Sequence, residues 1–318
     1  MTSSAMTSPA GARRRGEESA RRVLCLGEAL VDLICERQVD DVVAIRSFVP
    51  HFGGATANVA AVAAMEGAEV ALAGGAGADR WGEWLQTRLV RYGVDVSRFR
   101  LIPDAQTLVA LVTVAPGGEP HYEIYGSAVG SVVHALGDQV DAAVRDSAAL
   151  LISSNTLAGA EERAVTMRAR DVARELGRPV IFDANLRLHR WRSRADAAAS
   201  SNACVPGSLL VRATAAEAAI MTGEDDPEAA ATALLKAGAR MVVLTLGPQG
   251  AMLRGELKVD VPGVRARVLS TVGAGDVLTG ALVAHLAASR FYPPAVAAGL
   301  RRAVEQSARA CERWGALD

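Results

Sequence analysis

A regular alternation of apolar runs and helical segments between residues 149 and 246 limits most strongly how this chain can fold. Apolar strand-like runs lie at 149–153, 179–183, 208–211 and 240–246, and segments with helical patterning lie at 160–176, 194–203, 215–221 and 227–237. Strands that alternate with helices build a mostly parallel sheet covered on both faces. The expected fold class is therefore α/β, with three layers in the order α/β/α.

Shorter runs in the first 130 residues predict a small β-sheet attached to the main domain. Residues 108–114 and 122–125 are expected to form a hairpin, because Pro116-Gly117-Gly118 separates two alternating stretches. Residues 42–48 are expected to form a more exposed strand. The apolar run at 22–34 is expected to form a buried strand.

The N-terminal segment differs in composition from the rest of the chain. Residues 1–20 are rich in Ser, Ala, Arg and Gly and lack the apolar core of a secretory signal, so they are expected to be a disordered tail. Residues 21–318 show no interior linker and no repeat, which predicts one domain. No run reaches the ~18 apolar residues that a membrane span requires.

Charge and cysteine content argue against several classes of protein. The chain has 34 basic and 35 acidic residues and a net charge of −1, which gives no electrostatic basis for binding nucleic acid or an anionic membrane. Its four cysteines form no Cys-x-x-Cys pair, so zinc and a disulfide framework are not expected. The expected location is the cytoplasm.

A bend of small residues at 270–275 precedes Asp276 and an apolar helical run. Gly273 and Gly275 permit a tight turn, and the first N–H groups of the following helix lack internal partners. With the helix dipole, these groups form a candidate anion site. Asp276 is suited to take a proton from a hydroxyl that attacks a phosphoryl group. The alternative is an Asp that only complements the helix dipole.

A second candidate site lies at residues 51–60. Gly53 and Gly54 place bare backbone at a helix start, and Asn58 follows one turn later. An amide side chain both donates and accepts, which suits a neutral polyol such as a sugar. A tight turn followed by a solvent-facing Asn is the alternative.

Further candidates follow strands of the main sheet. Thr245, Gly247 and Gly250 close the strand at 241–246, where a hydroxyl and bare backbone suit a nucleotide and an ordinary hairpin turn is the alternative. Arg187 is a candidate partner for a phosphate or a substrate carboxylate, or else a surface ion pair. Glu217 is a candidate for holding hydrated Mg²⁺ through water, or else a first-turn Glu that complements a helix dipole.

Ligands bind such sheets beyond the carboxyl ends of the strands. Asp32, Asp183 and Asn185 each follow an apolar run and are expected on that rim. The chain has no Gly-x-x-x-x-Gly-Lys-Ser/Thr loop and no Gly-x-Ser-x-Gly elbow. Any use of ATP therefore proceeds without a Walker-type lysine.

Together these blocks resemble the ribokinase-like, or PfkB, carbohydrate kinase family over residues 23–316. Residues 270–276 resemble its signature Asp-Thr-x-Gly-Ala-Gly-Asp apart from Ser270, and residues 53–60 resemble its Gly-Gly signature. Residues 27–32 and 183–187 resemble the fructokinase and 2-keto-3-deoxygluconate kinase branch.

The resemblance implies a small β-sheet lid over the sugar, with strands from about 38–52 and 98–127, and a homodimer formed through that lid. It implies ATP and Mg²⁺ as cofactors and raises the question of a monovalent cation. Tyr122, Tyr125 and Ser127 of the lid are expected to touch the substrate. The implied roles are Asp276 as general base, the amides of Gly273, Ala274 and Gly275 as anion hole, Asp32, Gly53, Gly54 and Asn58 at the sugar, and Thr245, Gly247 and Gly250 beside ATP.

Two positions depart from the family pattern. Ser270 replaces the acidic residue that opens the last signature, which bears on monovalent-cation and nucleotide contacts. Thr214 replaces the Asn of the family's Asn-x-x-Glu motif, although Glu217 is kept, which bears on Mg²⁺ and phosphate binding.

The expected reaction is ATP-dependent phosphorylation of a primary hydroxyl of a sugar or sugar acid, as in fructokinase or 2-keto-3-deoxygluconate kinase. Arg187 favours an acidic substrate if it does not serve the nucleotide. One alternative is a nucleoside kinase of the same family. The other is a catalytically weak sugar-binding regulator, which the departures at Thr214 and Ser270 motivate.

Overall fold

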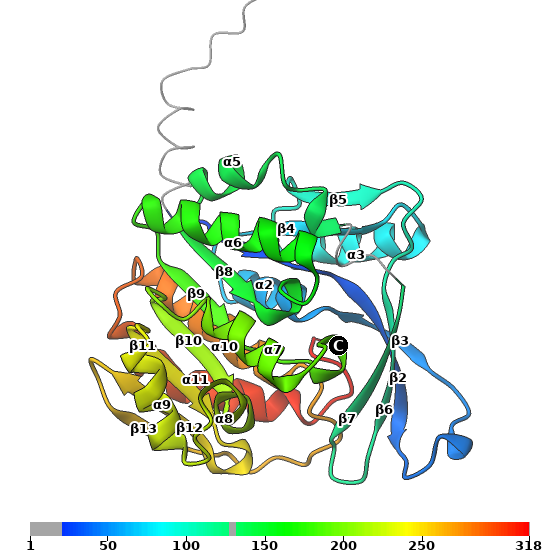
Figure 1. Ribbon diagram of the computed structural model, residues 1–318. Coiled ribbons are helices and arrows are strands. Elements are labelled where there is room, and N and C mark those ends of the chain that lie inside the picture. Colours follow the sequence, from blue (N-terminus) through cyan, green and yellow to red (C-terminus); the bar gives the residue numbers. More distant parts are fainter. Residues whose placement is uncertain (1–20, 127–131, 318) are drawn as a thin grey trace, which may run out of the picture.

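The computed structural model describes residues 21–126 and 132–317 (Figure 1). In these residues the larger sheet has the strand order β13-β12-β11-β10-β9-β8-β1-β4-β5. Neighbouring strands from β11 to β5 run parallel, whereas β12 is antiparallel to both of its neighbours. The strands are β1 (Val23–Leu26), β4 (Val70–Gly77), β5 (Phe99–Ile102), β8 (Ala149–Ser153), β9 (Val180–Asp183), β10 (Leu210–Thr214), β11 (Met241–Thr245), β12 (Gly250–Gly255) and β13 (Val259–Pro262).

Helices cover both faces of this sheet (Figure 1). One face packs against α2 (Ala55–Met65), α3 (Arg80–Arg91), α10 (Ala274–Ala288) and α11 (Ala295–Ala310). The other packs against α5 (Val140–Arg145), α6 (Ala160–Glu175), α7 (Arg194–Asn202), α8 (Ala215–Thr222) and α9 (Pro227–Lys236). Successive strand residues point to opposite faces, so Val23 joins the first core and Leu24 the second. The predicted α/β/α layers are confirmed.

A smaller sheet with the order β3-β2-β6-β7 projects from one side of this body (Figure 1). Its strands are β2 (Leu30–Gln38), β3 (Val49–Gly53), β6 (Val109–Val114) and β7 (Pro120–Tyr125). The pair β6 and β7 forms the predicted antiparallel hairpin. Leu30, Ile34, Leu108 and Val112 form a separate apolar cluster on this sheet.

The strands of the small sheet differ from the expected ranges 38–52 and 98–127. β2 was expected within a buried strand at 22–34, but the chain leaves the large sheet after Leu26 and β2 pairs with β3 and β6. β5 instead joins the large sheet beside β4. Residues 42–44 form a short 3-10 helix, η1 (Val42–Ala44), in place of a strand. An apolar run does not reveal which sheet it joins, because long-range pairing decides that.

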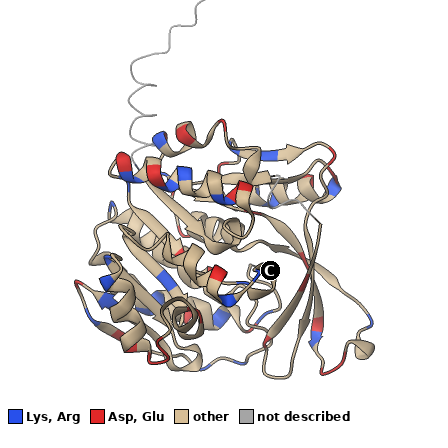
Figure 2. Ribbon diagram, viewed as in Figure 1, with Lys and Arg blue, Asp and Glu red and all other residues tan. Residues whose placement is uncertain are grey.

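Charged residues of both signs are interspersed over the helices and loops of the view in Figure 2. None of the helices within 21–126 and 132–317 is long and apolar enough to cross a membrane. The expected tail at 1–20 and the lid residue Ser127 lie outside the described residues.

Candidate active site

A pocket lies where the order of the large sheet reverses. From β1 the sheet grows through β4 to β5 on one side and through β8 to β11 on the other. Such a switch point opens a crevice beyond the carboxyl ends of the strands. Residues of both sheets line the pocket: Glu28, Leu30, Asp32, Gly54, Ala55, Asn58, Leu108, Ala110, Tyr122, Ile124, Asn155, Arg187, Arg190, Val272, Gly273 and Asp276.

This lining combines two kinds of surface. Leu30, Leu108, Ala110, Ile124 and Val272 contribute apolar side chains. Carboxylates, amides, guanidinium groups and the phenol ring of Tyr122, which was expected to touch the substrate, contribute polar groups. A few converging polar groups within a largely apolar concavity are typical of small-molecule sites. Of the residues predicted from sequence, the pocket brings together Asp32, Gly54, Asn58, Arg187, Gly273 and Asp276.

Asp276 lies in the first turn of α10 and is 5% exposed. Gly273, the N-cap, has a left-handed φ of 71°, and a Cβ there would lie 2.2 Å from Ala316 Cβ. One Asp276 oxygen accepts from Asn58 Nδ2 at 2.9 Å, and the other accepts from Asn185 Nδ2 at 3.0 Å. Two amides therefore fix the plane of the carboxylate.

The amides around this bend are not equivalent. The Ala274 N–H donates to the Thr271 carbonyl at 3.2 Å. The N–H groups of Gly275 and Asp276 have no acceptor among the residues that the structure describes. Open donors at a helix start attract an anion. The Gly273 N–H likewise has no acceptor among the described residues, so of the three amides predicted as an anion hole those of Gly273 and Gly275 are open and that of Ala274 is not.

Of the three buried carboxyl groups that line the pocket, Asp32 and Asp276 influence each other. Burial raises the pKa of Asp276 to about 7, and the hydrogen bond from Asn58 acts in the opposite direction. Burial also raises the pKa of Asp32 to about 7, and the charge of Asp276 adds to this shift. Desolvation disfavours the charged form of a carboxyl group. Near neutral pH both groups are therefore poised between protonated and ionised forms.

The two glycines that precede α2 lack a side chain for different steric reasons. A Cβ on Gly53 would lie 2.4 Å from Asp32 Oδ2, so the missing side chain makes room for that carboxylate. Gly54 has a φ of 96°, and a Cβ there would lie 2.7 Å from the Glu28 carbonyl. Both positions require glycine for close approach of backbone to neighbouring groups.

Asn58 is 2% exposed, so the alternative of a solvent-facing side chain is wrong. Its Oδ1 is buried without a partner among the described residues, as is Oδ1 of Asn185. Asn185 adopts a positive φ of 36° at the end of β9. Sequence reasoning placed Asn185 on the rim without a role. The structure places it on the opposite oxygen of Asp276 from Asn58.

Arg212 was missed by sequence reasoning. It lies opposite Asp183 in the register of β10 and β9, and is 4% exposed. Its guanidinium donates to Asp183 Oδ1 at 3.3 Å and to Thr245 Oγ1 at 3.2 Å. A Cβ on Gly275 would lie 2.7 Å from Arg212 Nη2. An arginine in the middle of an otherwise apolar parallel strand was the available signal.

The residues predicted at the nucleotide lie at the end of β11. Thr245 accepts from Arg212, and Gly247 opens a short 3-10 helix, η4 (Gly247–Gln249), with open space where its Cβ would be. Gly250 differs, because a Cβ there would lie 2.1 Å from the Val261 carbonyl. Gly250 is therefore required because β13 lies too close for a side chain at this position. The hairpin considered as an alternative is present, since β11 and β12 pair antiparallel.

Glu217 lies at the start of α8. One oxygen accepts from the Thr214 N–H at 2.7 Å and the other from the Leu186 N–H at 2.7 Å. The Thr214 hydroxyl accepts from the Glu217 N–H at 3.1 Å, which completes a capping box. Thr214, the departure from the family pattern, thus caps α8. Ser270 similarly accepts from the Val272 N–H at 3.1 Å.

No group of three or more His, Cys, Asp and Glu side chains in the described parts of the chain is placed to hold a metal ion. Mg²⁺ in phosphoryl-transfer sites commonly keeps several waters and is held by one or two carboxylates together with the substrate phosphates. The donors present therefore fit an ion that is carried by a nucleotide better than an ion held in a protein cage.

Arg187 precedes a short 3-10 helix, η3 (Leu188–Arg190), and is half-buried. Its Cζ lies 5.3 Å from the ring centroid of Tyr122. It forms no hydrogen bond or ion pair with another residue among those described. The guanidinium lines the pocket without a salt bridge to a described residue, and its charge opposes the rise in the pKa of Asp32 and Asp276. Tyr125 is 55% exposed and does not line the pocket.

The fold defines a class of protein: a ribokinase-like α/β/α protein in which residues of a small second sheet line the pocket. The sequence matches the family described as pfkB family carbohydrate kinase over residues 20–314, and the chain belongs to this family. It is a carbohydrate kinase that uses ATP and a divalent cation to phosphorylate a sugar.

Individual relatives are distant. The chain is 27% identical to fructokinase-1 of Oryza sativa subsp. japonica over 266 residues, which is 83% of this chain and 82% of that protein. It is 27% identical to aminoimidazole riboside kinase of Salmonella typhimurium over 287 residues, 88% of this chain and 86% of that protein. A fructokinase structure from Vibrio cholerae O395, with fructose, ADP and calcium bound, superposes with a TM-score of 0.80, 27% identity and coverage of 94% and 95%.

Proposed function

We propose that this kinase transfers the γ-phosphoryl group of ATP to a primary hydroxyl of a free sugar or sugar acid, with Asp276 as general base. One observation carries the proposal: the buried Asp276 carboxylate lies in the pocket, oriented by two amides, beside open N–H groups of the same helix start. A base next to an anion site suits attack by a hydroxyl on a phosphoryl group.

The other pocket residues have proposed roles at the sugar. Asp32 and Asn58 would accept from and donate to sugar hydroxyls, and Gly53 and Gly54 would keep the backbone close to them. Arg187 would hold a hydroxyl or a carboxylate of the substrate. The lack of an ion-pair partner for this guanidinium among the described residues supports a role in substrate binding.

The nucleotide would lie at the ends of β10 and β11. Thr245 and Gly247 would flank its phosphates, with Gly250 shaping the turn. The amides of Gly273 and Gly275, with Ala274 between them, would receive the transferring phosphoryl group.

When Mg²⁺ is bound, it neutralises charge on the β- and γ-phosphates. Glu217 would contact the hydrated ion through water, because both of its oxygens already accept backbone N–H groups. A monovalent cation near Ser270 is a further proposal.

Replacing Asp276 with Asn tests the general base. The amide keeps the shape of the side chain but cannot accept the proton. Loss of general-base catalysis typically lowers the rate about 10²- to 10⁴-fold, and we expect kcat/KM to fall within this range. The measurement is coupled detection of ADP release with the best sugar. Equal turnover by Asp276→Asn and the parent enzyme would show that the proposed role is wrong.

A substrate panel tests the sugar class. Fructose, 2-keto-3-deoxygluconate, ribose and adenosine are compared by kcat/KM. We expect fructose or the sugar acid to be preferred, and preference for the acid would be lost with Arg187→Met. Preference for adenosine would favour the nucleoside kinase, to which the similarity to aminoimidazole riboside kinase also points. Sugar-dependent thermal stabilisation without ADP release would favour a sugar-binding regulator.

Two properties of the whole chain complete the proposal. Dimerisation through the outer face of the small sheet is consistent with half-buried Leu111 and exposed Tyr125 there, and light scattering after gel filtration measures it. A cytoplasmic location is consistent with the cysteines, all of which are unpaired.

A further inference from the structure

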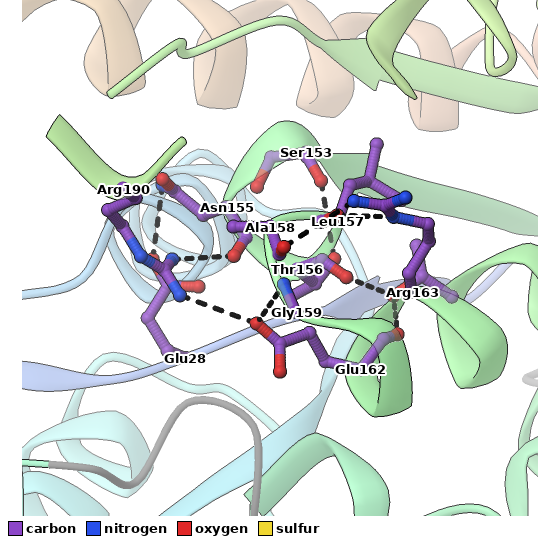
Figure 3. A network of polar contacts seen from close by, with 11 residues as sticks. Glu28, Ser153, Asn155, Thr156, Leu157, Ala158, Gly159, Glu162, Arg163 and Arg190 are labelled. Carbon is purple, nitrogen blue, oxygen red and sulfur yellow. Dashed lines mark hydrogen bonds and ion pairs between the residues drawn. The ribbon is translucent and has the colours of Figure 1, made fainter. Parts of the chain in front are cut away.

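A second polar cluster lines the pocket, distinct from the groups around Asp276. Glu28 follows β1, Asn155 lies in η2 (Ser154–Thr156) after β8, and Arg190 ends η3 after β9 (Figure 3). Strands β9, β8 and β1 are neighbours, and the sheet order reverses at β8 and β1. The topology therefore brings three polar residues from distant parts of the sequence to the crevice where ligands bind.

Glu28 has an incomplete set of hydrogen bonds. It is 4% exposed, and its Oε1 accepts from Asn155 Nδ2 at 3.3 Å. Its Oε2 is buried without a partner among the described residues. A buried polar atom without a partner destabilises the protein, and a charged one does so more than a neutral one. A donor supplied by the ligand in the pocket would remove this cost.

Arg190 is fixed in place beside Glu28. Its Nη1 donates to the Asn155 carbonyl at 2.5 Å, and its Nη2 lies 3.4 Å from Glu162 Oε1. Glu162 is itself held by the Gly159 N–H at 2.9 Å (Figure 3). These contacts use two of the five N–H donors of the guanidinium. Its other donors are available to a ligand in the pocket that Arg190 lines.

The charges of this cluster favour a neutral ligand group. The carboxyl groups of Glu28 and Glu162 are balanced by the guanidinium groups of Arg190 and Arg187, so the cluster has no surplus positive charge for a substrate carboxylate. A hydroxyl fits, because it can donate to a carboxylate and accept from a guanidinium at the same time. Burial raises the pKa of Glu28, and the charges of Arg190 and Arg187 oppose this shift without reversing it.

We propose that Glu28, Asn155 and Arg190 form a hydroxyl-recognition subsite of the sugar pocket. One secondary hydroxyl of the substrate donates to Glu28 Oε2 and accepts an N–H from Arg190, while Asn155 orients the carboxylate. The subsite rests on the proposed function. It binds a hydroxyl of the substrate other than the one that is phosphorylated. It separates the enzyme's substrate from sugars that lack this hydroxyl.

The test is a cycle between enzyme variants and substrate analogues. The kcat/KM of the parent is measured for the best sugar of the panel and for its monodeoxy analogues, each lacking one secondary hydroxyl. A hydrogen bond to a charged group corresponds to roughly 10- to 100-fold discrimination. We expect Glu28→Ala to reduce the penalty for one analogue to within about threefold of unity and to leave the other penalties unchanged.

Two further variants are measured, one as a conservative replacement of Glu28 and one as a control. Glu28→Gln keeps the shape of the side chain if Glu28→Ala does not fold, and is expected to lower the same single penalty in part. Glu36→Ala is the matched control, because Glu36 on β2 pairs with His51 and does not line the pocket. Penalties that stay unchanged in both Glu28 variants, or that fall equally at every position, would overturn the subsite.

Failure of the subsite and failure of the proposed function give different results. If the parent phosphorylates no sugar of the panel, the proposed function is wrong. Calorimetric binding of the sugars and their deoxy analogues, without nucleotide, then still measures the subsite. If the parent is active and the cycle shows no coupling to Glu28, only the subsite is wrong.

Discussion

At the scale of single residues, the environment of Asp276 determines its chemistry. The carboxylate is buried next to Asp32, and two amides and nearby guanidinium groups compensate it only in part. A general base works best when its pKa lies near the operating pH. The pKa of about 7 for Asp276 meets this condition, which an exposed aspartate would not.

The first prediction concerns the pH dependence of activity. Because the base must be ionised, we expect kcat/KM to fall about tenfold per pH unit below an apparent pKa near 7. Initial rates from pH 5 to 9 at subsaturating sugar measure this limb. A limb near pH 4, as for an ordinary aspartate, would contradict the assignment of Asp276.

The second prediction concerns stability. The folded-state pKa of Asp276 is raised from 3.8 to about 7, so the folded state binds more protons in this window and loses stability as the pH rises through it. Asp276→Asn removes this loss. We expect the variant to gain Tm relative to the parent at pH 8, and to gain little at pH 5. An equal difference in Tm at both pH values would contradict the shift.

The third prediction assigns Arg212 as a positioning residue behind the anion site. Its charge lowers the pKa of Asp276, and its guanidinium lies against Gly275. We expect Arg212→Met to lower kcat and to move the acid limb to higher pH, with partial recovery in Arg212→Lys. Arg254→Met is the control, because Arg254 is also buried in an ion pair but on β12. It should lower Tm and leave the acid limb unchanged.

At the scale of elements, the crossing of α2 and α10 determines the distance between Asn58 and Asp276. Gly280 lies one turn after Asp276, and a Cβ there would lie 2.6 Å from Val62 Cβ. Val62 lies one turn after Asn58. The close contact of the two helices one turn inward therefore keeps the two polar side chains at 2.9 Å.

The fourth prediction uses a matched pair of glycines. Gly280→Ala should push the two helices apart, destabilise the protein by about 1–3 kcal/mol and lower kcat, because Asn58 no longer orients Asp276. Gly299→Ala on α11 brings a Cβ to 2.8 Å from His285 Cγ at the other side of α10. It should destabilise the fold without a selective loss of kcat. Equal kinetic effects of the two variants, at matched Tm, would contradict the role of the crossing.

At the scale of the whole molecule, the layers were predictable and the sheet membership of early strands was not. Buried parallel strands read as continuous apolar runs, so the βα alternation after residue 149 was visible in the sequence. β1 and the first half of β2 were expected to form one strand at 22–34, and their separation into two sheets depends on pairing with strands far along the chain.

The candidate site was predictable in part for a similar reason. Asp276 and Asn58 stand in glycine-rich helix starts, which have a local signal. Arg212 and Glu28 contact neighbours from other strands, and although an arginine within an apolar strand is a local signal for Arg212, no local pattern reveals those contacts. The position of Glu217 in the sequence is compatible with two roles, because a capping-box Glu and a metal-binding Glu can both lie in the first turn of a helix.

The small sheet is also tied to the segment that forms the anion site. Gln38 at the end of β2 donates to the Leu269 carbonyl at 2.9 Å and to the Val268 carbonyl at 3.2 Å. In the turn between β6 and β7, the Gly118 carbonyl accepts from the Thr271 N–H at 2.8 Å. The small sheet therefore holds the segment that leads to Asp276, so we expect sugar binding under the proposed function to be coupled to the geometry around Asp276.

The fifth prediction tests this coupling with Gln38→Leu, which removes both side-chain hydrogen bonds. The two bonds together contribute about 1–3 kcal/mol. Only part of this is expected to appear in kcat, which at saturating sugar should fall roughly two- to tenfold because the bend before Asp276 is less well fixed. Hydrogen exchange should become faster at residues 268–272, and sugar should protect them less than in the parent. Gln86→Leu on α3, away from both sheet edges, should leave exchange there unchanged. Unaltered exchange at 268–272 in Gln38→Leu would mean that the small sheet and the phosphoryl site act independently.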